Sequence, residues 1–402
     1  MRLLGPRGGR RATAPAVVAA VAVASAVAWW TVRHGSHIDT AAFRESVHAA
    51  LRGDSPYFLS TSVPFVYPPP ALLVIVLSAV GPNVPVASII WTVVTLACLA
   101  RVTWLLVGLA WPTSAHERRV QLTCGLFGVA CLMEPSVRAL EYGQLGLILL
   151  WLTVEGLHGQ PRSSPRPLLV GLAAAVKLTP SIVLVGLAAA GRWRSAGWGL
   201  IGFIGAWVGA AIVAPAALRD YVRAGWRLAS DVNATPDVLN HSLIGVCSAA
   251  GLPAWAGIAG AAVTLIAGVA LTAALWRSDD ELGGLATVLI TGLLVSPVSW
   301  AHHWVACYPA LVLLAREART RRVSAVALIT VAVIGMLVQI DEIALPASRI
   351  LGPGEAWTLT FRAWYVAWGL AFLCWVALRV LPPIRRPEPQ PANRDERQPA
   401  LP

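Results

Sequence analysis

The stretch that decides the fold class is Ala254–Trp276, which reads AWAGIAGAAVTLIAGVALTAALW and contains no charged residue. Its 23 residues are enough for an α-helix that crosses the hydrocarbon core of a bilayer, which takes ~20 residues. Similar apolar tracts occupy Ala14–Val32, Leu168–Ala190 and Val323–Ile340. Together these tracts predict an all-α integral membrane protein with many membrane-spanning helices.

The composition of the whole chain favours the same class. Of the 402 residues, 57% are hydrophobic and 13% are charged, and the mean hydropathy is +0.67. Soluble domains carry about 25% charged residues, so an ordinary globular enzyme is excluded. The net charge of +11 would suggest nucleic acid in a soluble protein. Here the arginines lie in short loops and in the two tails, as the positive-inside rule describes, so we expect membrane lipids and no nucleic acid as partners.

The arginine distribution also predicts the topology. Basic residues precede the first tract and follow the last, Trp357–Leu381, which places both termini in the cytoplasm. The first tract is longer than the apolar part of a signal peptide, which favours an uncleaved span. We expect about twelve passes in one polytopic domain, residues 1–381, and a disordered cytoplasmic tail, residues 382–402. The segments predicted at the outer face are residues 33–70, 134–143, 215–253, 296–303 and 341–356.

Two regions leave the helix count open. Leu168–Ala190 either makes two short passes broken at Lys177–Pro180 or crosses once. In the first case Ala71–Val80 is a short outer-face helix, and in the second it is a full span. Both alternatives give the same total. Amphipathic patterns at Thr40–Arg52 and Leu218–Ser230 predict juxtamembrane helices at the outer face.

Polar side chains that need an explanation gather on the predicted outer face, apart from Lys177, the only lysine, which lies inside an apolar tract. Asp39 follows the first span and is the candidate general base, although it can also be interpreted as the cap of a helix that begins at Thr40. The remaining candidate binding residues are Tyr67, Arg138, Glu141, Tyr142, Gln144, Arg219, Asn240, His241, His302 and His303.

These residue types suit one kind of chemistry. A carboxylate can deprotonate a hydroxyl acceptor, cations can hold a phosphate leaving group, and the apolar body can hold a lipid chain. The pattern therefore predicts transfer of a sugar from a lipid phosphate. Three outer-face tryptophans, Trp226, Trp300 and Trp304, can stack on a sugar ring or anchor the chain at the interface. A pair of histidines without a third ligand does not make a metal site, and the six cysteines form no CxxC pair.

Six short motifs follow one another along most of the chain. They are Asp39 with Arg52-Gly53-Asp54-Ser55-Pro56-Tyr57, Tyr67-Pro68-Pro69, Glu141-Tyr142-Gly143-Gln144, Lys177-Leu178-Thr179-Pro180, Asn240-His241-Ser242-Leu243, and Ser296-Pro297 through His302-His303-Trp304. In this order they resemble glycosyltransferase family 87, membrane enzymes of the GT-C superfamily that use polyprenol-phosphate-mannose. The resemblance implies a GT-C-type helical bundle in the bacterial plasma membrane, with its active site on the outer face.

The resemblance further implies an inverting α-mannosyltransferase that acts on a glycolipid or lipoglycan acceptor in cell-envelope biosynthesis. An α-1,2 bond is one linkage that such an enzyme could form. Asp39 would be the base, and His302 or His303 would lie near the donor phosphate or the acceptor. Lys177 and one of Arg138, Arg219 or Arg223 would contact the phosphate. The sequence contains neither a nucleotide-sugar motif nor a DxD pair, which agrees with a lipid-linked donor, so neither a metal nor a cofactor is expected. Asn240-His241-Ser242 departs from the family's frequent Asn-Gln-Ser, which leaves acceptor specificity open.

Three other functions fit parts of the pattern. A related enzyme could use polyprenyl-phospho-arabinose or -glucose with the same base and phosphate contacts. A lipid or solute transporter would place polar residues at the midplane and show repeated halves; Lys177 and Arg101 are the residues most consistent with it, and no repeat is visible. A noncatalytic membrane subunit would leave Asp39 replaceable.

Overall fold

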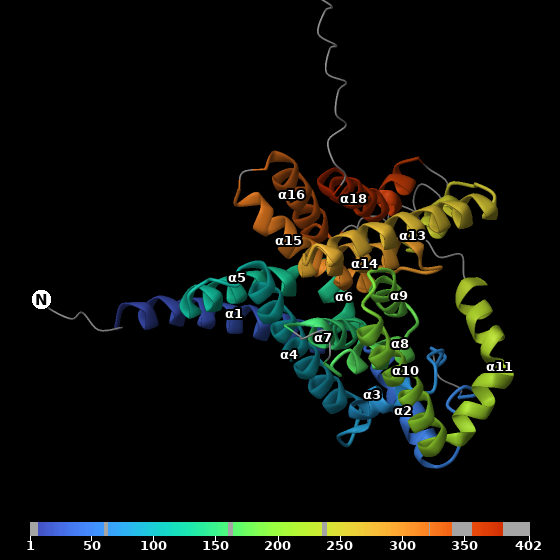
Figure 1. The fold of residues 1–402 in the computed structure, drawn as a ribbon. Helices are drawn as coiled ribbons and strands as arrows, with labels where there is room; N and C mark the ends of the chain where they lie inside the picture. Colours follow the sequence, from blue (N-terminus) through green and yellow to red (C-terminus); the bar gives the residue numbers. More distant parts are fainter. Residues whose placement is uncertain are drawn as a thin grey trace, which may run out of the picture.

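The computed structural model describes residues 7–59, 63–159, 164–234, 239–320, 322–339 and 356–380, and every regular element within them is a helix. Figure 1 shows their arrangement. The first half contains α1 (Arg7–His34), α2 (Ile38–Leu51), α3 (Ala71–Ile75), the 3₁₀ helix η1 (Val76–Ala79), α4 (Val84–Ala110), α5 (His116–Leu132), α6 (Glu134–Tyr142), α7 (Gly146–Leu157), α8 (Leu168–Val176) and α9 (Ser181–Ala189). The second half contains α10 (Trp193–Val213), α11 (Pro215–Ala234), α12 (Leu243–Ala249), α13 (Ala254–Arg277), α14 (Glu281–Val295), the 3₁₀ helix η2 (Ala301–Cys307), α15 (Tyr308–Ala318), α16 (Val323–Leu337) and α18 (Ala356–Val380).

Several of these helices can cross a membrane, which confirms a multi-pass helical membrane protein. Five helices in the described part are long and apolar enough, and the bent pair α5 and α6, at 65°, raises the number to six. The five segments are Thr13–His34, Val84–Ala110, Trp193–Val213, Ala254–Arg277 and Ala363–Val380. Helices α7, α14 and α16 are apolar but shorter. The total of twelve passes therefore stays a prediction.

The tract Leu168–Ala190 is broken, as the first of the two alternatives predicts. Helix α8 ends at Val176, Lys177 is extended with φ −148° and ψ 131°, and α9 begins at Ser181. Pro180 occupies the position before α9, where its missing N–H costs no helical hydrogen bond. In agreement with the same alternative, Ala71–Val80 contains only the short helices α3 and η1.

Both predicted amphipathic helices are present as α2 and α11. The side chains of α11 are described only as far as Ala224. The predicted outer segment at 341–356 lies outside the described residues except for Ala356, and so does the whole predicted tail, 382–402. All six cysteines are free thiols.

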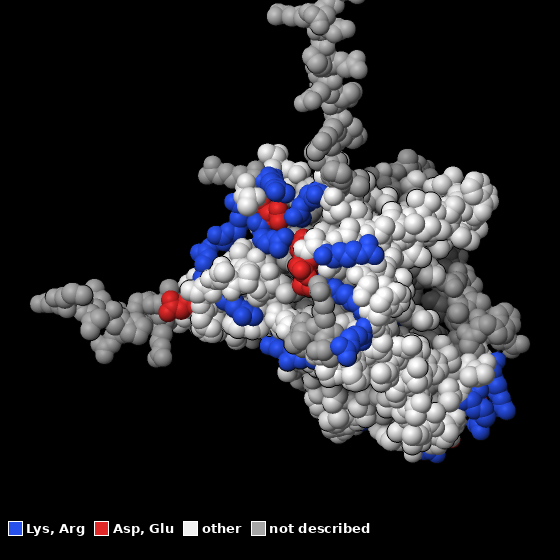
Figure 2. All heavy atoms as spheres, in the orientation of Figure 1, with Lys and Arg blue, Asp and Glu red and all other residues white. Residues whose placement is uncertain are grey.

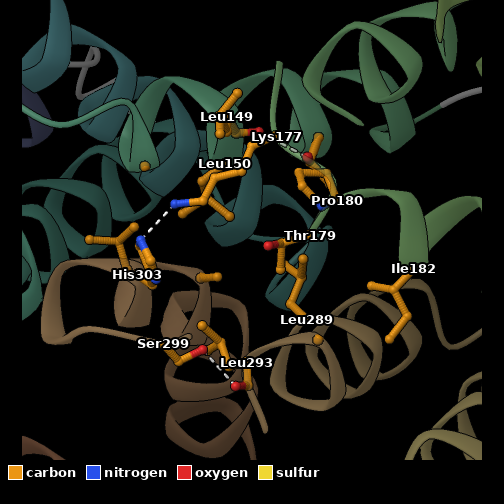
Figure 3. Close-up of a pocket in the computed structure, with 15 residues that line it drawn as sticks. Leu149, Leu150, Lys177, Thr179, Pro180, Ile182, Leu289, Leu293, Ser299 and His303 are labelled. Carbon is orange, nitrogen blue, oxygen red and sulfur yellow. Dashed lines mark hydrogen bonds between the residues drawn. The ribbon is translucent and has the colours of Figure 1, made fainter. Parts of the chain in front are cut away.

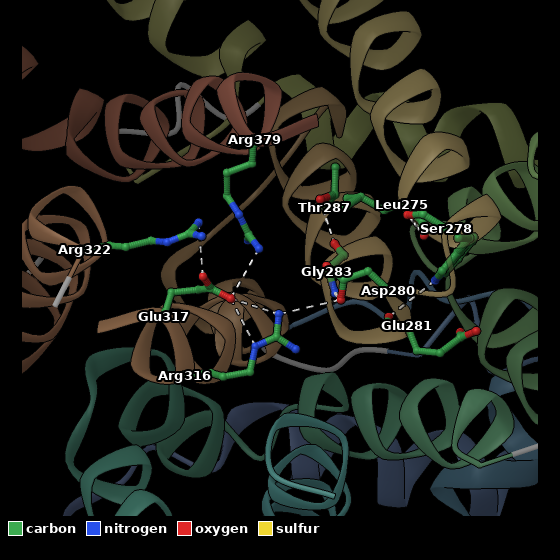
Figure 4. A network of polar contacts seen from close by, with 11 residues as sticks. Leu275, Ser278, Asp280, Glu281, Gly283, Thr287, Arg316, Glu317, Arg322 and Arg379 are labelled. Carbon is green, nitrogen blue, oxygen red and sulfur yellow. Dashed lines mark hydrogen bonds and ion pairs between the residues drawn. The ribbon is translucent and has the colours of Figure 1, made fainter. Parts of the chain in front are cut away.

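One ion-pair network ties several helices together at one end of the molecule (Figure 4). Glu317 of α15 is 8% exposed and pairs with Arg316 at 3.1 Å, Arg379 of α18 at 3.3 Å and Arg322 before α16 at 3.4 Å. Arg316 also approaches Asp280 before α14 at 3.8 Å. Figure 2 shows that basic side chains gather around a few acidic ones over this part of the molecule. Networks of this kind contribute more to stability than isolated surface ion pairs do. The ends of α14, α15, α16 and α18 are therefore held together there.

The turn between α1 and α2 packs directly on the C-terminal end of α6. His37 has a left-handed backbone with φ 48°, and its N–H donates to the carbonyl oxygen of Glu141 at 2.8 Å. Gly143 ends α6 with φ +79°, and a Cβ at this position would overlap Oγ1 of Thr40. The sequence Glu-Tyr-Gly-Gln thus needs its glycine both for the helix end and for the close approach.

We expect Gly143→Ala to destabilise the protein more than Gly53→Ala does. Both glycines have φ near +80°, but no atom lies within 4 Å of a Cβ built on Gly53. Gly53→Ala should therefore cost only the backbone strain, ~1 kcal/mol, whereas Gly143→Ala adds a collision with Thr40. Thermal unfolding of both variants in detergent checks this expectation. Equal melting temperatures would show that the α1–α2 turn does not press on Gly143.

Candidate functional site

Asp39 lies in the first turn of α2 and is 8% exposed. The cap position of α2 is occupied by His37, whose side chain forms no capping bond. The carboxylate of Asp39 instead accepts a hydrogen bond from Nε2 of Gln144 at 2.6 Å. The alternative interpretation, in which Asp39 caps a helix at Thr40, is therefore wrong.

A chain of polar contacts continues from this carboxylate into the protein. Oε1 of Gln144 accepts a hydrogen bond from the hydroxyl of Tyr67 at 3.1 Å. The ring of Tyr67 lies 5.9 Å from Nζ of Lys177, which in turn lies 2.6 Å from Nε2 of His303. The predicted site residues Asp39, Gln144, Tyr67, Lys177 and His303, although far apart in sequence, form one network.

Asp39 opens onto a cavity of about 240 Å³. Its polar lining consists of Asp39, Arg138, Tyr142, Gln144, Trp300 and His302, and its apolar lining of Ile38, Val63, Leu239 and Ala301. His302 is 4% exposed, and its Nε2 has no hydrogen-bond partner in the described part of the chain. The rings of Tyr142 and Trp300 lie against it, at 5.8 and 5.5 Å between centroids. A hydroxyl-rich ligand would thus find a carboxylate, an amide, an imidazole and two aromatic rings.

Burial changes the protonation of these groups. It raises the pKa of Asp39 to about 6, although the hydrogen bond from Gln144 and the charge of Lys177 act in the opposite direction. Burial, followed by the charge of Lys177, lowers the pKa values of His302 and His303 well below their ordinary range. Near neutral pH the cavity therefore holds an ionised carboxylate that accepts a proton readily, beside neutral histidines.

A second, narrower cavity of about 60 Å³ is lined by the Lys177–His303 pair (Figure 3). Its walls are mostly apolar side chains from α7, α9 and α14, among them Leu149, Ile182 and Leu289. Its polar side chains are Thr153, Lys177, Thr179, Ser299 and His303. A cation at the end of an apolar cavity is suited to the phosphate of a lipid whose chain follows the apolar walls.

The predicted residues Arg138 and Glu141 pair with each other on α6 at 2.8 Å, and both are largely buried. This pairing keeps the guanidinium of Arg138 at the cavity wall without leaving a bare buried charge. Glu141 thus neutralises and positions the guanidinium of Arg138, but it does not line the cavity itself.

Asn240 and His241 support the site from outside the cavity lining. Nδ2 of Asn240 donates to the carbonyl of Pro297 at 2.9 Å, and its Oδ1 accepts from the N–H of Ser299 at 2.9 Å. The N–H of His241 donates to the carbonyl of Ser299 at 2.7 Å. These bonds hold the loop that leads from α14 into η2, where His302 and His303 lie.

The structure does not bring Arg219 to either cavity. Its side chain is 59% exposed on α11 and pairs with Asp220 at 3.3 Å, as Arg223 does at 3.9 Å. Of the three tryptophans, Trp300 lines the cavity. The sugar-stacking interpretation is wrong for Trp304, which is fully buried against Tyr365 at 4.8 Å. The side chain of Trp226 lies outside the described part. No group of three or more metal-ligating side chains occurs in the described residues.

Tyr365 of α18 is a supporting residue that sequence reasoning missed. Its hydroxyl donates to the buried carboxylate of Glu134 on α6 at 2.9 Å, and its ring lies 4.7 Å from that of His241 and 4.8 Å from that of Trp304. It joins α6 and η2, which line the cavity, to the Asn240 loop that braces it. No sequence signal marked it, because it lies in an otherwise apolar terminal tract.

We expect Tyr365→Phe to lower the free energy of unfolding by about 1–3 kcal/mol, because the buried Glu134 carboxylate loses a hydrogen bond while ring packing is kept. Tyr221→Phe is the matched control, since the hydroxyl of the half-buried Tyr221 has no hydrogen-bond partner in the described chain. Thermal unfolding of the two purified variants makes the comparison. An unchanged melting temperature for Tyr365→Phe would refute the supporting role of its hydroxyl.

Comparisons with known proteins place the chain among membrane glycosyltransferases. The model of glycosyltransferase family 87 matches residues 65–297. The chain is 30% identical, over 78% of its length and 77% of the relative's, to a polyprenol-phosphate-mannose-dependent alpha-(1-2)-phosphatidylinositol pentamannoside mannosyltransferase of Mycolicibacterium smegmatis. It is also 30% identical, over 80% of its length and 78% of the relative's, to a polyprenol-phosphate-mannose-dependent alpha-(1-2)-phosphatidylinositol mannoside mannosyltransferase of Mycobacterium tuberculosis.

The family match contains Tyr67, Gln144, Lys177 and Asn240, while Asp39 and the histidine pair lie outside its bounds. The matched segment and these flanking residues meet at the same cavity. With more than half of its residues matched, this chain belongs to glycosyltransferase family 87.

Proposed function

We propose that this protein transfers mannose from polyprenol-phosphate-mannose to a phosphatidylinositol mannoside and forms an α-1,2 linkage. The donor, the acceptor class and the linkage come from the printed names of its relatives. The observation that carries the proposal is the Asp39 carboxylate, which is buried at a polar cavity and has its pKa raised to about 6.

The chemical step uses this carboxylate as the base. The hydroxyl of the acceptor gives its proton to Asp39 as its oxygen attacks the anomeric carbon of the donor mannose. The bond between that carbon and the phosphate oxygen breaks, and polyprenyl phosphate leaves with both electrons. Attack from the face opposite the β-linked phosphate inverts the anomeric carbon and produces an α-mannoside.

The leaving phosphate needs a cation, and Lys177 is the residue best placed to supply it. It lines the apolar cavity beside His303, and its charge acts on Asp39 of the polar cavity. We assign the apolar walls to the first part of the polyprenyl chain, and His302 and Arg138 to oxygen atoms of the donor or acceptor. In this scheme Tyr142 and Trp300 pack against a sugar ring, and no metal or cofactor takes part.

The proposed topology keeps both termini in the cytoplasm, with about twelve passes and the reaction at the outer face. The basic residues before α1 and after α18 support it. In this arrangement Arg219 lies on the outer surface of α11 and belongs to the juxtamembrane region, outside the reaction cavity.

We expect Asp39→Asn to lower the rate of mannose transfer by at least ~10²-fold, since an amide keeps the size of the side chain but cannot accept the proton. Asp54→Asn is the matched control, because the Asp54 side chain is 61% exposed and, within the described residues, pairs with Arg52 alone. The assay measures transfer of labelled mannose from polyprenol-phosphate-mannose to phosphatidylinositol mannosides, in EDTA and at equal expression.

Asp39→Asn with wild-type activity would remove Asp39 as the base. Wild-type protein that rejects mannose but accepts polyprenyl-phospho-arabinose or -glucose would assign the same site to another donor. Wild-type protein that transfers none of these sugars would refute the proposed function.

We expect the transfer rate to rise with pH through about 6, the raised pKa of Asp39. Below this pH the carboxyl is protonated and cannot accept a proton, and above it the carboxylate is ionised, so the low-pH limb should reflect one group. The measurement is kcat/KM for the donor against pH in detergent. A rate independent of pH between about 5 and 7 would contradict a base with this pKa.

A further inference from the structure

A third cavity, of about 460 Å³, lies where α9, α10 and α13 meet. Its lining consists of Arg192, Arg194, Arg277, two tryptophans and the Ala190–Gly191 turn, with no acidic side chain. It shares no lining residue with the two cavities of the reaction site.

Local sequence explains why the arginines converge. Helix α9 ends at Ala189, and Gly191, with φ +79°, reverses the chain so that α10 begins two residues later. Arg192 therefore directly precedes α10, and Arg194 lies in its first turn. Arg277 comes from the last turn of α13, and its guanidinium donates to the carbonyl of Ala189.

One of the three arginines is neutralised and forms a fixed wall. Arg192 donates to both carboxylate oxygens of Glu281, at 2.6 and 2.8 Å, and to the carbonyl of Trp276 at 2.6 Å. Such a bidentate pair holds the guanidinium plane in place. In contrast, Arg194 and Arg277 have no carboxylate partner in the described chain, so the cavity carries excess positive charge.

The cavity lies far from the reaction site along the helices. Arg277 ends α13, a helix of 24 residues that extends ~36 Å and whose other end follows α12 and the Asn240 loop. Helix α14, with 15 residues and ~22 Å, leads from Glu281 beside this cavity to the Ser296–His303 segment of the reaction site. The reaction site and the basic cavity therefore lie toward opposite ends of the same helices.

The surroundings of the cavity indicate a lipid environment. Trp193 is 70% exposed at the start of α10, as is common where helices meet the membrane interface. The candidate spans of α10 and α13 have only 17% and 28% of their residues buried. Both present apolar side chains outward, including Ile204 at 51% and Ile266 at 71% exposure. A molecule bound at the basic cavity could thus extend acyl chains along these helices.

We propose that this cavity binds the phosphate headgroup of an anionic phospholipid. The guanidinium groups of Arg194 and Arg277 bind the phosphate oxygens, and the N-terminus of α10 adds its favourable dipole. The acyl chains lie on the exposed apolar faces of α10 and α13. The site is separate from the reaction cavity and holds a lipid that is not consumed.

The test measures binding of dioleoyl-phosphatidylglycerol to the full-length protein in neutral detergent by native mass spectrometry and by thermal stabilisation, with phosphatidylcholine for comparison. We expect Arg194→Gln to weaken binding of one phosphatidylglycerol by about tenfold or more and Arg194→Gln/Arg277→Gln by more still, because each loses a charge-assisted contact. Arg118→Gln is the matched control, since Arg118 is an exposed arginine in the first turn of α5 and lines none of the cavities described above.

Undiminished phosphatidylglycerol binding in both arginine variants would overturn the proposal, and so would equal weakening by Arg118→Gln. Inorganic phosphate that stabilises the protein as strongly as phosphatidylglycerol does, at the same concentration, would replace the lipid with a free anion. The readouts do not depend on sugar transfer, so failure here leaves the proposed function untouched and the reverse also holds. The single Arg194 variant leaves the bond from Arg277 to Ala189 intact, which keeps the test free of that structural change.

Discussion

The reaction site depends on the close contact between the α1–α2 turn and the end of α6. The N–H of His37 donates to Glu141, and Gly143 leaves room for Thr40, so Gln144 is held within 2.6 Å of the Asp39 carboxylate. A buried carboxylate without such a bond would carry a large desolvation cost. The hydrogen bond makes the burial of Asp39 possible, and the remaining desolvation raises its pKa into the range useful for a base.

Charge balance explains why the apolar cavity is lined by a lysine, Lys177. Asp39 and Lys177 are the anion and the cation of one partly buried network, connected through Gln144 and Tyr67. Each charge lowers the electrostatic cost of burying the other. The break between α8 and α9 places Lys177 in the wall of the apolar cavity, where in our proposal it binds the phosphate of the lipid donor.

Two further groups of ion pairs lie away from this chemistry. Glu317 with its arginines and Glu281 with Arg192 connect helix ends at the opposite end of α14 from the histidine pair. These pairs join helices that are otherwise largely apolar. The reaction site is therefore supported by helices whose far ends are fixed by ion pairs and, in our proposal, by a bound phospholipid.

The helical membrane class follows from the sequence alone, because hydropathy and helix propensity act over neighbouring residues. Local signals also marked a break at Lys177–Pro180 as one of two possible courses of its tract and Asp39 as a candidate base. The packing of the helices, in contrast, was needed to find that Gln144 binds Asp39, that Asn240 and His241 brace a loop, that Arg219 lies on the surface and that Tyr365 supports the cavity. Asp39 and Gln144 are separated by 105 positions. Contacts over such separations follow from how whole helices pack, and no local pattern records that packing.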